Sequence, residues 1–187
     1  AEVILAVAVV GTSVALYPLI RRYGQGLAAA YVALRTLEAS VILAGVVVLL
    51  PVVARPGSAL ASGLDPAVAD GLRLVHDWTF LVGPGLVCPV NTVVLAWLLH
   101  RHGLVPRYIT VLGLVGGPLI GLANLAVLAG MTATVPAAAL PIFAWEISLA
   151  VRLIRRGLPA PSATGGPADD SRGDALGSAP LPVVIAG

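Results

Sequence analysis

Charged residues are rare in five long apolar runs of this chain, and this scarcity limits the possible folds more than any other feature. The runs cover residues 3–20, 27–53, 74–99, 108–131 and 136–154. A membrane-spanning helix needs roughly 17–25 apolar residues, because about 30 Å of hydrocarbon is crossed at about 1.5 Å per residue. We therefore expect an all-α fold: a polytopic transmembrane helical bundle with five spans in this chain.

The composition excludes several other classes of protein. Charged residues make up 11% of the chain and hydrophobic residues 58%, whereas soluble domains carry about 25% charged residues. The net charge of +2 comes with no basic patch interleaved with aromatics, so we expect the lipid bilayer as a partner and no nucleic acid. Cys88 is the only cysteine and the histidines are scattered, so we expect no disulfide, no metal site and no cofactor.

The distribution of arginine predicts the orientation in the membrane. Arginines cluster after the first run, between the third and fourth runs, and at the end of the fifth, whereas the alternate connections hold only Arg55 and Arg73. Cytoplasmic loops carry the excess of positive charge. We therefore expect a multi-pass protein of the cell inner membrane with residue 1 outside and the C-terminal end in the cytoplasm. The use of arginine without lysine, with abundant Ala, Val and Gly, is typical of a GC-rich bacterial genome.

The segments between and after the runs predict two further features. Residues 54–73 form a long outer loop, in which Asp65 and Pro66 are placed to begin a short helix. Residues 1–157 form the bundle. Residues 158–187 are rich in Pro, Gly, Ala, Ser and Asp, so we expect a disordered cytoplasmic tail.

Small residues and prolines inside the runs predict how the helices pack. Gly113, Gly117 and Gly121 lie on one helix face, where they allow another helix to approach closely. Packing within the bundle is the favoured interpretation, and a homo-oligomer formed through residues 113–121 is the alternative. Prolines should kink their helices, the third run most of all. They are Pro84, Pro89, Pro118 and Pro141.

Polar side chains that remain inside the runs fall at two depths. Counted at about 1.5 Å per residue, one layer lies about 12–15 Å from the arginine-rich ends. It contains Arg35, Glu38, Asn91 and Glu146. A second group lies near the outer side and contains His76, Asp77 and Asn124. His76 and Asp77 are adjacent, so they diverge by about 100° on a helix, and a hydrated helix entry explains them as well as a binding site does.

Arg35 and Glu38 are three residues apart, so they can pair on one helix, and arginine has donors left for Glu146. With both acids ionised this cluster has a charge of −1. The favoured interpretation is an ionic clamp that holds the helices in register. The alternative is a small transporter or channel that binds an ion or anionic solute at the layer formed by Arg35, Glu38 and Glu146, with the small-molecule ligand unidentified. An enzyme is less favoured, because no nucleophile–base arrangement is visible.

The chain resembles a bacterial membrane family filed as domain of unknown function 4386. The resemblance covers residues from about 10 to 157, and its most specific parts are the Arg35–Glu38 pair, His76-Asp77-Trp78, Asn91, Leu104-Val105-Pro106-Arg107 and Trp145-Glu146. It implies a six-span inner-membrane protein, and hence that the first span of the family is missing from this chain. It implies no particular activity.

Overall fold

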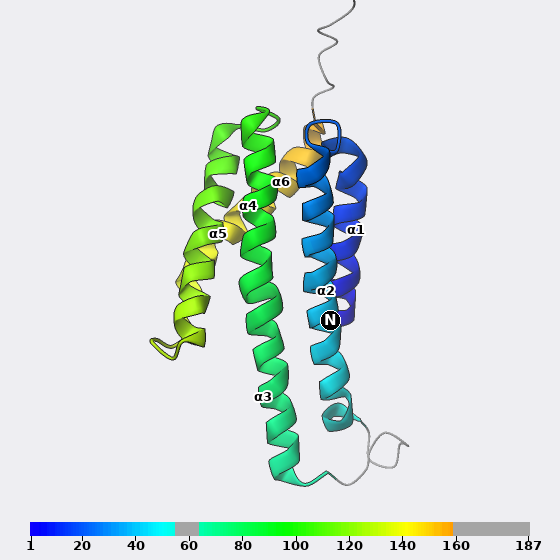
Figure 1. Ribbon diagram of the computed structural model, residues 1–187, viewed down its shortest axis with the longest axis vertical. Helices are drawn as coiled ribbons and strands as arrows, with labels where there is room; N and C mark the ends of the chain where they lie inside the picture. The colour runs from blue at the N-terminus through cyan, green and yellow to red at the C-terminus, as the bar shows by residue number, and fades with distance from the viewer. Residues whose placement is uncertain (55–63, 159–187) are drawn as a thin grey trace, which may run out of the picture.

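The computed structural model describes residues 1–54 and 64–158, and this part of the chain is helical with no strand (Figure 1). The part of the predicted outer loop at residues 55–63 and the predicted tail beyond Leu158 lie outside the described residues. The elements are α1 (Glu2–Ile20), α2 (Gln25–Val53), α3 (Pro66–Val82), η1 (Gly83–Val87), α4 (Cys88–Arg101), α5 (Arg107–Leu128), η2 (Pro136–Ala139) and α6 (Leu140–Arg156).

Five segments are long and apolar enough to cross a membrane, which confirms the predicted all-α fold. They are Glu2–Ile20, Gln25–Val53, Pro66–Arg101, Arg107–Leu128 and Pro136–Arg156. The third combines α3, η1 and α4 into one 36-residue rod. Large apolar side chains remain exposed on these helices, for example Ile4 at 74% and Ile154 at 84%. Such a surface suits lipid, because a soluble protein rarely leaves so large an apolar area in water.

The helices pack in an order that leaves one side of the bundle open. α1 and α2 form an antiparallel hairpin, the α3–η1–α4 rod packs beside α2, and α5 packs on α4. α6 packs on α5 and then crosses obliquely behind the bundle toward the connection between α1 and α2 (Figure 1). The connections rich in arginine gather at one end of the bundle, which we call the arginine-rich end.

The third helix extends beyond its apolar run. Asp65 and Pro66 begin a helix as the sequence predicts, but this helix is not a separate short one: α3 runs without a break from Pro66 into the apolar run at residue 74. Asp65 caps its N-terminus, because the carboxylate oxygen Oδ1 accepts a hydrogen bond of 2.8 Å from the backbone N–H of Ala67. Proline is favoured at the first helical position. An ion pair of 2.7 Å between Arg73 and Asp70 supports the next turn, so α3 extends beyond its apolar part.

The prolines at which the sequence predicts kinks lie in three spans and take different positions there; Pro118 lies in the interior of α5. In the third span the prolines lie at or next to η1, a π-helical segment that contains Pro84 and ends two residues before Pro89. Proline lacks the N–H group of a regular helix, and π-turns accommodate such interruptions. Pro141 lies in the first turn of α6, where the N–H that proline lacks has no helical partner to lose, so this position gives no reason for a kink.

Candidate functional site

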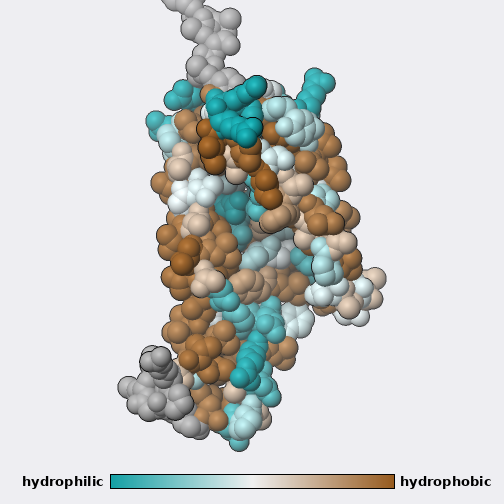
Figure 2. All heavy atoms as spheres, turned by 180° about the vertical axis from the view of Figure 1, so that it is seen from behind, coloured by the Kyte–Doolittle hydropathy of each residue, from teal (hydrophilic) through white to brown (hydrophobic). Residues whose placement is uncertain are grey.

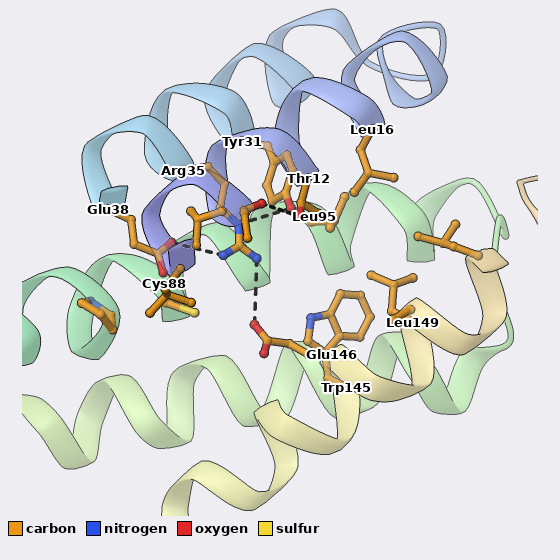
Figure 3. A pocket seen from close by; sticks show the side chains of 16 residues that line it. Thr12, Leu16, Tyr31, Arg35, Glu38, Cys88, Leu95, Trp145, Glu146 and Leu149 are labelled. Carbon is orange, nitrogen blue, oxygen red and sulfur yellow. Dashed lines mark hydrogen bonds and ion pairs between the residues drawn. The ribbon is translucent and has the colours of Figure 1, made fainter. Parts of the chain in front are cut away.

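Arg35 lies at the centre of a group of polar side chains inside the bundle (Figure 3). Its Nη1 atom lies 3.3 Å from Oε2 of Glu38, one turn farther along α2. Its Nε atom donates a 3.3 Å hydrogen bond to the hydroxyl of Tyr31, one turn earlier. Its Nη2 atom lies 3.9 Å from Oε1 of Glu146 on α6. The guanidinium therefore joins two helices that are far apart in the sequence.

Glu38 and Asn91 form the buried half of this group. The side-chain amide of Asn91 donates a hydrogen bond of 2.6 Å to Oε2 of Glu38. Glu38 is 3% exposed and Asn91 is fully buried, so this bond ties α2 to α4 in the interior. A hydrogen bond to a charged acceptor is stronger than one between neutral groups, and a low-dielectric interior strengthens it further. The other amide atom of Asn91, Oδ1, has no hydrogen-bond partner within the described part of the chain.

Glu146 forms the open half. Its side chain is 47% exposed, whereas that of Arg35 is 13% exposed. A separation of 3.9 Å is longer than the 2.7–2.9 Å or so of a close charge-assisted hydrogen bond. The Glu146 carboxylate is therefore held loosely, with room for another donor beside it.

These charges form the wall of a cavity of about 430 Å³, which we call the arginine pocket. Four elements besides the η1 turn supply its lining, because α1 and α6 stand apart over α2 and α4 (Figure 3). Figure 2, seen from the side of α6, shows a hollow in the hydrophobic surface with hydrophilic side chains at its floor. The lining residues are Leu5, Ala8, Val9, Thr12, Leu16, Tyr31, Arg35, Glu38, Pro84, Cys88, Leu95, Trp145, Glu146, Leu149, Ala150 and Leu153.

The four residues placed in one layer by the sequence are brought together, but the sequence missed the rest of the wall. Tyr31 is four residues before Arg35, so its place on the same helix face could have been found from the helical repeat alone. Thr12 gives no such signal in the sequence. In the structure, its hydroxyl donates a hydrogen bond to the carbonyl oxygen of Ala8 within α1. Its position facing Arg35 depends on how α1 packs on α2.

The predicted outer group is divided between two sides of α3. His76 lies 3.5 Å from the carboxylate of Glu2 on α1, and its ring stacks at an angle on Phe80. Asp77 and Asn124 instead line a second cavity of about 520 Å³, which we call the Asp77 pocket. The amide of Asn124 donates a 2.8 Å hydrogen bond to the carbonyl oxygen of Gly85 in η1. The 100° between neighbouring helix positions accounts for this separation.

The glycines of α5 lie against other helices of the same chain. A Cβ atom at Gly113 would lie 2.8 Å from the ring of Trp145, and one at Gly117 would lie 2.8 Å from Val93. Gly121 faces Pro89 at a wider spacing. These contacts give the glycines a packing role between α5 and its neighbours α4 and α6. The homo-oligomer through residues 113–121 stays a prediction.

The arrangement has the chemistry of a binding surface for a charged or polar group. Within residues 1–54 and 64–158, no three His, Cys, Asp or Glu side chains come together as a metal ion would need. The arginine pocket offers a fixed cation at Arg35, a half-exposed carboxylate at Glu146 and hydrocarbon walls around both. Such a mixture of a few placed polar groups with apolar walls is typical of small-molecule sites.

Comparison with known proteins identifies a family. The family model described as "Domain of unknown function (DUF4386)" matches residues 1–157, which includes all six α-helices. Neither a curated protein nor a solved structure matches the chain.

Proposed function

Because this chain belongs to the DUF4386 family, whose description prescribes no activity, we propose its function from the arginine pocket. The protein is a multi-pass membrane protein that binds a small solute within the bilayer, at the arginine pocket, as a transporter or a solute receptor does. The observation that carries this proposal is a cavity of about 430 Å³ with Arg35, Glu38 and Glu146 in its wall. Charged residues inside a membrane bundle commonly face a cavity and mark a solute pathway.

The second candidate function is that the same residues form an ionic clamp that holds the helices in register. This interpretation accounts for the buried half of the group but not for Glu146. Asn91 holds Glu38 at 2.6 Å in the interior, which is what a device that fixes helix register requires. Glu146 fits that role poorly, because a half-exposed side chain 3.9 Å from its partner contributes little to stability. We therefore assign the buried half of the group to packing and the open half to binding.

Cysteine labelling tests whether solute reaches the pocket. Thr12→Cys places a thiol in the pocket wall, and Val7→Cys places one elsewhere on α1, at a residue that is 67% exposed and does not line the pocket. Both are made with Cys88→Ser, since Cys88 also lines the pocket. A water-soluble, membrane-impermeant methanethiosulfonate reacts with the thiolate, which forms only where water reaches the thiol. In nanodiscs, we expect the thiol of Thr12→Cys to react at least tenfold faster than the thiol of Val7→Cys. If both thiols react at the same slow rate, the proposal is contradicted.

We further propose that the arginine-rich end faces the cytoplasm of a bacterial inner membrane, on the strength of the positive-inside rule. The test compares His102→Cys, in the connection between α4 and α5, with Ala67→Cys at the start of α3. Both are exposed positions. On intact cells, an impermeant thiol reagent should label Ala67→Cys and spare His102→Cys. The reverse pattern would invert the orientation.

A further inference from the structure

We propose that the arginine pocket selects an amphipathic monocation, with an ammonium group beside Glu146 and an apolar body along α1 and α6. This inference rests on the proposed function and specifies the class of its ligand. It departs from the anionic solute that the sequence left open.

The charge of the pocket is the first argument. Arg35 contributes one positive charge, and Glu38 and Glu146 contribute two negative charges when ionised, so the sum is −1. A net charge is unfavourable in the low-dielectric interior of a membrane bundle. A bound monocation brings the pocket to neutrality, whereas an anion would bring it to −2.

The hydrogen-bond partners show which carboxylate is free to meet the cation. Glu38 is already held by Arg35 at 3.3 Å and by Asn91 at 2.6 Å, and it is buried. Glu146 has a single ion partner in the described part of the chain, 3.9 Å away, and half of its side chain is exposed. A carboxylate has two acceptor oxygens, so Glu146 can accept hydrogen bonds from a further donor.

The rest of the wall determines what kind of cation fits. Leu16 of α1 and Leu149 of α6 lie on opposite sides of the cavity (Figure 3), and Leu5 and Leu153 also line it. A hard metal ion such as Ca²⁺ takes about six or more oxygen ligands, and this wall is mostly hydrocarbon. An organic ammonium ion satisfies Glu146 with its N–H groups and buries its hydrocarbon part against the leucines. The source of such a group is either a free amine or an amine-bearing lipid head group.

Protection of the pocket thiol from labelling tests the selection of charge. The Thr12→Cys, Cys88→Ser protein is placed in phosphatidylglycerol nanodiscs with 4-phenylbutylammonium, 4-phenylbutyrate or 4-phenylbutanol. These probes have nearly the same phenylalkyl body, one methylene shorter in the butyrate, and they differ in charge. We expect the amine to slow labelling at least tenfold at concentrations at which the other two change it less than twofold. Protection by the butyrate, or equal protection by all three, would overturn the proposal.

Variants of Glu146 identify the residue responsible. Glu146→Gln should raise the amine concentration for half-protection at least tenfold, and Glu146→Asp should keep most of the protection. Glu2→Gln is the matched control, because it removes the same charge at a distant position beside His76; it should leave protection unchanged. An unchanged melting temperature establishes that each variant is folded. If Glu146→Gln is protected like the parent, Glu146 does not select the ligand and the proposal is wrong.

The same experiment separates the two proposals and the two sources of the amine. If Thr12→Cys without probe is as slow to react as Val7→Cys, the proposed function itself fails; if it reacts quickly but the amine gives no protection, only the present inference fails. Adding phosphatidylethanolamine to the discs tests the lipid source. A fall in labelling that Glu146→Gln reverses indicates a lipid head group, and an unchanged rate with amine protection retained indicates a free amine. Either result supports a cation-selective pocket.

Discussion

The arginine pocket and the Asp77 pocket are similar in size and both touch Pro84 of η1, yet their walls differ in kind. Their volumes are about 430 and 520 Å³. The first has three charged residues in its wall, drawn from α2 and α6. The second has one, Asp77, and the amide of Asn124 beside it is already bonded to Gly85. The larger cavity therefore has fewer charged side chains in its wall. The candidate site is identified by these charges and not by its volume.

The two regions also differ in the partner of their asparagine side chain. One asparagine bonds to a backbone carbonyl oxygen, and the other bonds to a side chain. Asn124 satisfies a carbonyl oxygen in the π-helical segment, where the regular helical hydrogen bonds are interrupted. Asn91 satisfies a carboxylate on another helix. The first bond repairs one span locally, and the second joins two spans. Removing each group should therefore have effects of different size.

We predict the largest effect for Arg35→Leu, which leaves the carboxylates of Glu38 and Glu146 without their cation. Breaking a buried ion pair typically costs about 3–5 kcal/mol of unfolding free energy, whereas replacing the whole group with apolar residues is often nearly neutral. The triple variant Arg35→Leu, Glu38→Leu, Glu146→Leu should therefore recover most of the loss. The measurement is denaturant unfolding in mixed micelles. If the triple variant is no more stable than Arg35→Leu, the ionic group does not hold the helices together.

Asn91→Leu should have the next largest effect, because it removes the donor that Glu38 meets at 2.6 Å and leaves a buried carboxylate less satisfied. Hydrogen bonds to charged groups contribute about 1.5–3 kcal/mol, so we expect a loss in this range. The same unfolding experiment measures it. Combining Asn91→Leu with Glu38→Gln should give less than the sum of the two single losses, and strict additivity would show that the two side chains are not coupled.

Asn124→Leu should have the smallest effect and serves as the matched comparison, since the amide-to-leucine change is identical. Its bond joins two neutral groups, and such bonds within membrane bundles average about 0.6 kcal/mol. We expect a loss near that value and no change in amine protection at the arginine pocket. A loss as large as that of Asn91→Leu would mean that the bond to the π-helical segment supports the bundle as strongly as the bond to Glu38.

Much of the architecture was predictable from the sequence, because membrane spans follow from hydropathy and length alone. The five apolar runs correspond to the five spans. The shared depth of Arg35, Glu38, Asn91 and Glu146 also follows from counting residues, since a constant helical rise converts sequence position into depth. Hydropathy alone did not join the first two turns of α3 to the apolar run, because they contain Asp70 and Arg73, and a cap and an ion pair support them.

Depth is the only coordinate that the sequence determined, and the tertiary structure decided the rest. Which way each helix turns about its axis depends on side-chain packing with its neighbours, and this rotation separates His76 from Asp77. The oblique course of α6 leaves Glu146 half exposed beside a cavity, while Glu38 at a similar depth is buried. The distinction between a clamp and a binding surface thus arises from rotation and crossing of helices, which hydropathy does not encode.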